Sequence, residues 1–193
     1  TAQDWPNCLC WWCGFFYEAG SWEYSLSVPH NVKKIIEKSG GEDLFQKRLN
    51  VLFDNGYYNV GNEPSFLTSC LYHWIGRPDL SSERTRKIIT DNYDASSCGI
   101  PGNDDSGAMS SWLAFHMMGL YPNAGQSYYL ITSPFFRQTK MHMENGKTFM
   151  ITAKNLYDKN RFVKSAALNG VKYDKSWIEH ADVAAGGELL FEM

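Results

Sequence analysis

The spacing of hydrophobic residues changes near residue 122. Before it, apolar side chains recur three or four positions apart between Gly- and Pro-containing stretches, which indicates amphipathic helices. After residue 126, short apolar runs alternate with turn residues, which is typical of β-strands. We therefore expect a mainly α-helical part over residues 1–122 and a β-rich appendage over residues 123–193.

Five helices are expected in the first part, and punctuation residues indicate their ends. Gly40-Gly41 is a C-terminal helix signal, and Pro64 suits the first turn of a helix. Ser81 and Ser82 can cap a helix N-terminus. The expected apolar faces lie at residues 32–36, 44–53, 66–75, 88–89 and 109–117.

Four short strands are expected in the second part, at residues 128–131, 149–152, 162–168 and 189–191. Asn145-Gly146 and Asn169-Gly170 are strong hairpin signals, so we expect the strands to run antiparallel. Helices in series can build a bundle, a solenoid or an α/α toroid, and periodicity alone does not choose among them.

Composition excludes several function classes. The chain has 193 residues and a net charge of −3, and it carries no stripe of Lys and Arg that could neutralise nucleic-acid phosphates. Its most apolar run, residues 8–16, is about half of the roughly 20 residues that a membrane-spanning helix needs. Aromatic residues make up 15% of the chain, enough to fill a core or to line a pocket for flat-faced ligands such as sugars.

The cysteine count is odd. Cys8, Cys10 and Cys13 form a cluster, whereas Cys70 and Cys98 stand alone. No Cys or His pair follows the cluster at the spacing of a zinc site, which favours buried thiols over metal ligands. One disulfide among the five cysteines is a further alternative.

Three loops are denser in polar and aromatic groups than core packing needs: residues 16–24, 61–65 and 99–107. Their carboxyl groups belong to Glu18, Glu23, Glu63, Asp104 and Asp105. Glycoside hydrolysis needs two separated carboxyl groups, one protonated and one ionised. A Glu among aromatic rings suits the acid, because desolvation raises a carboxyl pKa, and an Asp at a helix N-terminus stays ionised. Asp105 or Ser106 as a simple N-cap, and Glu63 as a first-turn charge, are the structural alternatives.

In their order along the chain, these loops resemble the signatures of glycoside hydrolase family 92, the calcium-dependent exo-acting α-mannosidases, and most closely its fungal-type branch. The resemblance covers nearly the whole chain. Its motifs lie at residues 16–18, 22–24, 28–30, 40–41, 56–58, 61–65, 72–73, 102–105, 107–109, 119–122, 133–134, 168–170 and 176–178.

The resemblance implies a role for each matched residue. Glu18 corresponds to the general acid and Asp105 to the general base. Asn103 stands where many members have a second Asp, and its amide can orient a water molecule but cannot take a proton. The implied calcium ligands are Asn62 and Glu63, and the implied substrate-binding residues are Trp22, Glu23, His30 and Asp104.

The resemblance also implies an architecture and a substrate. The helices would form part of an (α/α)6 toroid, and the chain, which stops in an apparent strand, would be a fragment that lacks the family's N-terminal β-sandwich and first barrel helices. The parent would be a secreted, inverting enzyme that releases terminal α-linked mannose, with α-1,2 linkage expected, from N-glycans or mannan. Another toroid glycosidase, of glucosidase or trehalase type, and an inactive sugar-binding remnant are the alternatives.

Overall fold

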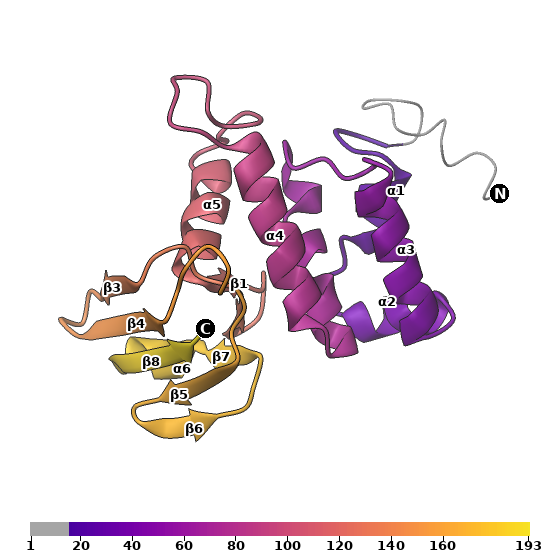
Figure 1. Cartoon of the computed structure of the whole chain (residues 1–193). Coiled ribbons are helices and arrows are strands. Elements are labelled where there is room, and N and C mark those ends of the chain that lie inside the picture. The colour runs from indigo at the N-terminus through magenta and orange to yellow at the C-terminus, as the bar shows by residue number, and fades with distance from the viewer. Residues whose placement is uncertain (1–15) are drawn as a thin grey trace.

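The computed structural model describes residues 16–193, so the cluster of Cys8, Cys10 and Cys13 lies outside the described residues. A helical region occupies one side of the molecule, and a β-rich region packs beside its last two long helices (Figure 1). The mainly α expectation with a C-terminal β-rich part is confirmed at this level.

The helical elements follow the expected apolar faces closely. They are α1 (Ser21–Leu26), α2 (Val32–Lys38), α3 (Glu42–Asp54), the 3₁₀ helices η2 (Glu63–Ser65) and η3 (Thr68–Ile75), α4 (Pro78–Asn92), and α5 (Ala108–Met118). Gly41, Gly76 and Gly119 have positive φ angles next to helix ends, where only glycine adopts this conformation without strain. None of the helices in residues 16–193 is long and apolar enough to cross a membrane.

One helix was not predicted, and two helix predictions were wrong in detail. The aromatic loop contains α1, a six-residue helix that is too short to show a period. The segment after Pro64 forms two 3₁₀ helices instead of one α-helix. The fourth helix begins at Pro78, so Ser81 and Ser82 are buried inside it instead of capping it. Pro78 begins this helix because its fixed φ suits the first turn and its missing N–H is not needed there.

The β-rich region contains two sheets. Their strands are β1 (Leu120–Pro122), β2 (Tyr128–Ile131), β3 (Gln138–His142), β4 (Thr148–Lys154), β5 (Ser165–Leu168), β6 (Val171–Tyr173), β7 (Trp177–Glu179) and β8 (Gly187–Glu192), and α6 (His180–Ala184) precedes β8. One sheet has the order β1-β2-β7 and the other β3-β4-β8-β5-β6. The hairpins at Asn145-Gly146 and Asn169-Gly170 are confirmed.

The expectation of antiparallel strands is wrong for one pair, because β8 runs parallel to β4. β8 comes after β5, β6, β7 and α6, and this long connection lets the chain return and enter between β4 and β5 in the same direction as β4. Tight-turn residues report hairpins between neighbouring strands only, so no local signal marks this pairing.

Buried polar contacts join the helices to the sheets. His73 on η3 lies with Nδ1 2.8 Å from the Ser81 hydroxyl and with Nε2 2.8 Å from the Ile131 carbonyl of β2. The Arg86 guanidinium of α4 donates to the Pro134 carbonyl at 2.8 Å and lies 4.0 Å from the centroid of the Phe135 ring. These contacts attach η3 and α4 to the β-rich region, which packs beside the helices (Figure 1).

Candidate functional site

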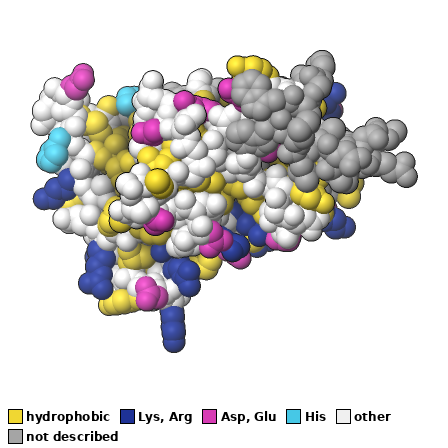
Figure 2. Space-filling model, turned by 90° about the horizontal axis from the view of Figure 1, so that it is seen from above, with side chains coloured by type: hydrophobic (Ala, Val, Ile, Leu, Met, Phe, Trp, Pro, Cys, Tyr) yellow, Lys and Arg dark blue, Asp and Glu magenta, His cyan; other side chains and the backbone are white. Residues whose placement is uncertain are grey.

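Residues from all three polar loops meet at one end of the helical region. The α4–α5 loop rises above α4 and α5, at the same end of the helical region as the segment that leads into α1 (Figure 1). A depression of about 490 Å³ lies between them and is lined by Glu18, Asn59, Gly61, Asn62, Pro101, Gly102, Asn103 and Asp105. Acidic side chains are visible near the middle of this face in Figure 2, which looks down on it. Four of the nine predicted site residues therefore line one cavity: Glu18, Asn62, Asn103 and Asp105.

The two carboxyl residues of this cavity have unusual backbones. The φ angles of Glu18 and Asp105 are 57° and 44°, and that of Ser106 is 60°. A left-handed conformation is uncommon outside glycine and costs of order 1 kcal/mol or more, and such residues cluster at functional sites. The loops therefore hold Glu18 and Asp105 in backbone conformations that local sterics disfavour.

Asn62 anchors the Glu18 loop. Its side chain is only 9% exposed, and its Nδ2 atom donates to the Glu18 carbonyl oxygen at 2.7 Å. This hydrogen bond ties the start of η2 to the segment before α1, although 44 residues separate the two partners. The amide orientation leaves Asn62 Oδ1 as the oxygen that can face a cation or a hydroxyl group.

The remaining predicted residues have other surroundings. Glu23 is 8% exposed and its carboxylate accepts the Gly20 N–H at 2.9 Å, so it caps the N-terminus of α1. Trp22 is buried, with its ring 5.4 Å from that of Tyr57. The Asp104 carboxylate accepts from the Ser110 N–H at 2.8 Å and the Ser110 hydroxyl at 2.9 Å.

The capping alternative for Asp105 or Ser106 is wrong, because the side chain that bonds the start of α5 belongs to Asp104. Asp105 is thereby left exposed at the depression instead of being used by the helix. His30 and Glu63 are exposed, and neither lines the depression.

Sequence reasoning missed Asn59 and Pro101 as lining residues. Asn59 Oδ1 accepts the Gly61 N–H at 2.7 Å, which is a side-chain-closed turn of the kind that Asn favours. The Asn-x-Gly spacing was the available signal for this turn. Nothing local marks Pro101, because its place at the site depends on how the α4–α5 loop folds over the depression.

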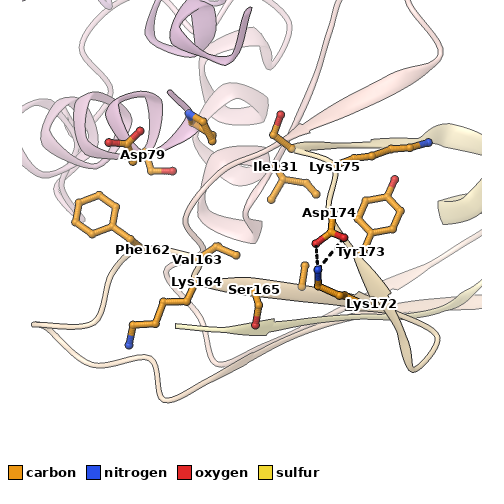
Figure 3. A pocket seen from close by; sticks show the side chains of 14 residues that line it. Asp79, Ile131, Phe162, Val163, Lys164, Ser165, Lys172, Tyr173, Asp174 and Lys175 are labelled. Atoms are coloured by element: carbon orange, nitrogen blue, oxygen red, sulfur yellow. Dashed lines mark hydrogen bonds and ion pairs between the residues drawn. The ribbon is translucent and has the colours of Figure 1, made fainter. Parts of the chain in front are cut away.

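A second depression, of about 380 Å³, lies between the start of α4 and the strands β5 and β6 (Figure 3). Lys172 pairs there with Asp174 at 2.8 Å, and the ammonium of Lys164, also at its edge, donates to the Met193 carbonyl at 2.8 Å. None of the nine predicted site residues lines it.

Comparison with known proteins identifies the family. The sequence model described as the glycosyl hydrolase family 92 catalytic domain matches residues 4–193. The chain belongs to glycosyl hydrolase family 92. Within the curated proteins, an uncharacterized secreted glycosidase of Arthroderma benhamiae is 43% identical over 176 residues, covering 90% of this chain and 23% of that protein.

Solved structures of family 92 members have the same fold. The α-mannosidase BT3965 of Bacteroides thetaiotaomicron, solved in complex with mannoimidazole, is 34% identical with a TM-score of 0.88, covering 93% of this chain and 26% of that one. The inverting mannosidase BT2199 of the same organism is 28% identical with a TM-score of 0.85, over 92% of this chain and 28% of that one. The chain thus spans about a quarter of the length of the relatives it matches.

Family 92 is generally calcium-dependent. Within residues 16–193, no cluster of three or more His, Cys, Asp and Glu side chains could hold a metal ion. Calcium also accepts amide, backbone carbonyl and water oxygens, and the depression is lined by amide side chains as well as by two carboxylates. The donor types of the depression therefore fit calcium, although the described side chains do not by themselves complete a coordination shell.

Proposed function

We propose that this chain carries the acid and the base of an exo-acting, inverting α-mannosidase. The observation that carries the proposal is that Glu18 and Asp105, 87 positions apart in the sequence, line one depression in a chain of family 92. The mannosidase activity of BT3965 and BT2199, which share this fold, supports the choice of sugar.

Glu18 acts as the general acid. It protonates the glycosidic oxygen as the bond to the leaving group breaks, so that the departing sugar leaves as a neutral alcohol. Its carboxyl group belongs to the loop before α1, whereas Asp105 belongs to the loop between α4 and α5, and both residues line the depression.

Asp105 acts as the general base and removes a proton from the attacking water molecule. An inverting reaction places this water on the face of the sugar opposite the leaving group, which requires about 6.5–9.5 Å between the two carboxyl groups. Asn103 lines the same depression and orients the water through its amide, which accepts or donates a hydrogen bond but takes no proton.

Asn62, at the depression, and Glu63, which follows it in the chain, would hold calcium together with carbonyl and water oxygens. When bound, the ion polarises sugar hydroxyl groups and favours distortion of the ring. The proposed substrate-binding residues are Trp22, Glu23, His30 and Asp104. Glu23 and Asp104 hold loops of the site through their caps, and His30 is exposed.

The chain is part of a longer, secreted enzyme. The helices within residues 16–122 are the closing helices of an (α/α)6 toroid, residues 123–193 form its β-rich C-terminal region, and a β-sandwich with the first barrel helices precedes them. The substrates are mannose-containing oligosaccharides and glycoprotein glycans such as N-glycans or mannan, with α-1,2-linked terminal mannose as the cleaved unit. The relative named as a secreted glycosidase supports the extracellular location.

The proposal is tested by release of mannose from α-1,2-mannobiose, with this chain and with the longer protein, in calcium and in EDTA. Calcium-dependent release supports the function, and cleavage of α-glucosides without calcium would replace it with the glucosidase alternative. Mannose binding without turnover by the longer protein would make the chain part of a sugar-binding remnant.

The role of Glu18 is tested by Glu18→Gln. We expect turnover of mannobiose to fall at least 10²-fold and turnover of a dinitrophenyl mannoside far less, because only the poor leaving group needs a proton. Equal losses on both substrates would remove Glu18 from the acid role. Glu144→Gln, on the β3–β4 turn, is the matched control and should leave both rates unchanged.

A further inference from the structure

The loops that carry Glu18 and Asp105 are joined by a short series of contacts through residues 61 and 62. On one side, Asn62 Nδ2 donates to the Glu18 carbonyl oxygen at 2.7 Å. On the other side, the backbones of Gly61 and Gly102 touch: a Cβ atom added to Gly102 would lie 2.3 Å from the Gly61 carbonyl oxygen. The Glu18 loop and the Asp105 loop therefore meet the same dipeptide.

This contact tolerates no side chain. A real Cβ atom does not approach a backbone oxygen to 2.3 Å. Any residue larger than glycine at position 102 must therefore push the Asp105 loop away from the backbone of Gly61. A Cβ on Gly61 would in turn lie 3.0 Å from the Pro101 carbonyl oxygen. Gly102 has an ordinary φ angle, so glycine is required there by the close approach of another backbone and not by conformation.

The central dipeptide is itself held in place. The Gly61 N–H donates to Asn59 Oδ1 at 2.7 Å, and the Asn62 side chain is nine-tenths buried. The carbonyl oxygen of Glu18, a residue with a left-handed backbone, accepts the hydrogen bond from Asn62 Nδ2. The two contacts thus act on the backbones that aim the carboxyl groups.

We propose that Asn62 and Gly102 are positioning residues that together fix the placement of the Glu18 loop relative to the Asp105 loop. This inference rests on the proposed function for its catalytic meaning. It assigns to Asn62 a role that its Nδ2 donor performs, in addition to any role of its Oδ1 as a calcium ligand. It assigns to Gly102 the close approach that brings the base loop over the depression.

The contacts are tested without catalysis by amide hydrogen exchange in EDTA, on the 193-residue chain. The reporters are the Gly20 N–H, which is bonded to Glu23, and the Ala108 N–H, which is bonded to the Asp105 carbonyl oxygen. Asn62→Asp keeps an oxygen for a cation but removes the donor, and Gly102→Ala inserts the clashing Cβ. Asn145→Asp and Gly125→Ala are the controls. Asn145 Nδ2 also donates to a backbone carbonyl, and Ala at position 125 adds local backbone strain, because φ is 73° there, but no clash with another segment.

Asn62→Asp removes the hydrogen bond that holds the Glu18 carbonyl oxygen, so the loop should open more often and exchange of the Gly20 N–H should become about tenfold faster. The decisive result is transfer between loops: Gly102→Ala, made on the Asp105 loop, should also speed exchange at Gly20 by at least threefold, whereas neither control should change it. If Gly102→Ala affects only Ala108, and Asn62→Asp only Gly20, the two loops are independent and the inference is wrong.

A rate measurement separates this inference from the proposed function. Asn62→Asp should slow mannobiose more than the dinitrophenyl mannoside, because it displaces the acid, and calcium should not restore the difference. Gly102→Ala should slow both substrates about 10²-fold through kcat, since water activation serves both, and should slow mannobiose further, because the loop that carries the acid is disturbed as well. Equal slowing of both substrates by Asn62→Asp, or its full rescue by calcium, overturns the positioning role. No turnover by the unmodified longer protein overturns the proposed function instead, and the exchange result still decides whether the loops are coupled.

Discussion

The imidazole of His116 on α5 is fully buried, and neither ring nitrogen has a hydrogen-bond partner within residues 16–193. Its ring stacks on that of Tyr121 with the centroids 4.3 Å apart and meets the Trp112 ring edge-on at 4.4 Å. Burial, and secondarily the neighbouring His73, lowers the pKa of His116 from 6.5 to about 3. The folded protein therefore keeps this ring neutral over the ordinary working range of pH.

Replacing His116 with Phe removes the two polar atoms and keeps a flat ring. A buried polar group without a partner costs about 1–3 kcal/mol, and the slightly larger Phe ring returns part of this gain as strain. At pH 7 we therefore expect the free energy of unfolding to stay unchanged or to rise by about 1 kcal/mol.

The larger effect is on pH dependence. In the unfolded chain His116 titrates near 6.5, whereas in the folded chain it titrates near 3. The unfolded state therefore binds more protons between these values, and stability is lost as the pH falls from 6.5 toward 3. Between pH 7 and pH 5 the titration of His116 lowers the free energy of unfolding of the unmodified protein by about 2 kcal/mol. His116→Phe has no titrating group at this site and does not lose this contribution.

The assay is urea unfolding followed by tryptophan fluorescence at pH 7 and pH 5. The pKa of the buried His73 is also lowered by desolvation, but His73 is present in both proteins and cancels in the comparison. The exposed His142→Phe is the control and should leave the pH dependence as it is. If His116→Phe loses as much stability as the unmodified protein between the two pH values, His116 does not contribute to the pH dependence. The folded protein then does not hold its imidazole neutral and without a partner.

Three further outcomes are expected. Phe149→Ala, at a 0% exposed position of β4, should lower the free energy of unfolding by about 3–5 kcal/mol, whereas Val171→Ala, 70% exposed, should change it by less than about 0.5 kcal/mol in the same urea assay. Glu23→Ala, which leaves a backbone N–H before α1 without its acceptor, should cost about 1–2 kcal/mol; an unchanged midpoint would show that the cap is not formed. With the three cysteines before residue 16 replaced by Ser, a thiol reagent should label Cys98 at once and Cys70 only on unfolding. Cys98 is exposed, whereas Cys70 is buried and burial raises its pKa to about 12. Rapid labelling of both cysteines would contradict the buried position of Cys70.

Local sequence signals located the regular elements well where they were long or sharply marked. The apolar period of α3 and the Asn-Gly turns beside β4 and β5 depend on neighbouring residues alone, and both were confirmed. The signal failed where tertiary packing decided the conformation. Ser81 reads as a cap but is buried inside α4, because its hydroxyl contacts His73.

The candidate site shows the same division. The polar loops and their order along the chain pointed to Glu18 and Asp105, and the structure brings these residues into one depression. Residue type could not tell which neighbouring carboxylate serves the backbone. Asp104 caps α5 and Glu23 caps α1, so these two carboxylates are bonded by N–H groups while Asp105 faces the depression.

The sequence by itself determined the two-part organisation, most helices, both hairpins and the family, because each follows from residues that are close in the chain or from the order of short motifs. Only the tertiary structure decided the parallel pairing of β4 with β8, the backbone contact of Gly61 with Gly102 and the hydrogen bond from Asn62 to Glu18. Each of these joins segments some 40 residues apart, and such contacts form only when the whole chain packs, so no local pattern encodes them.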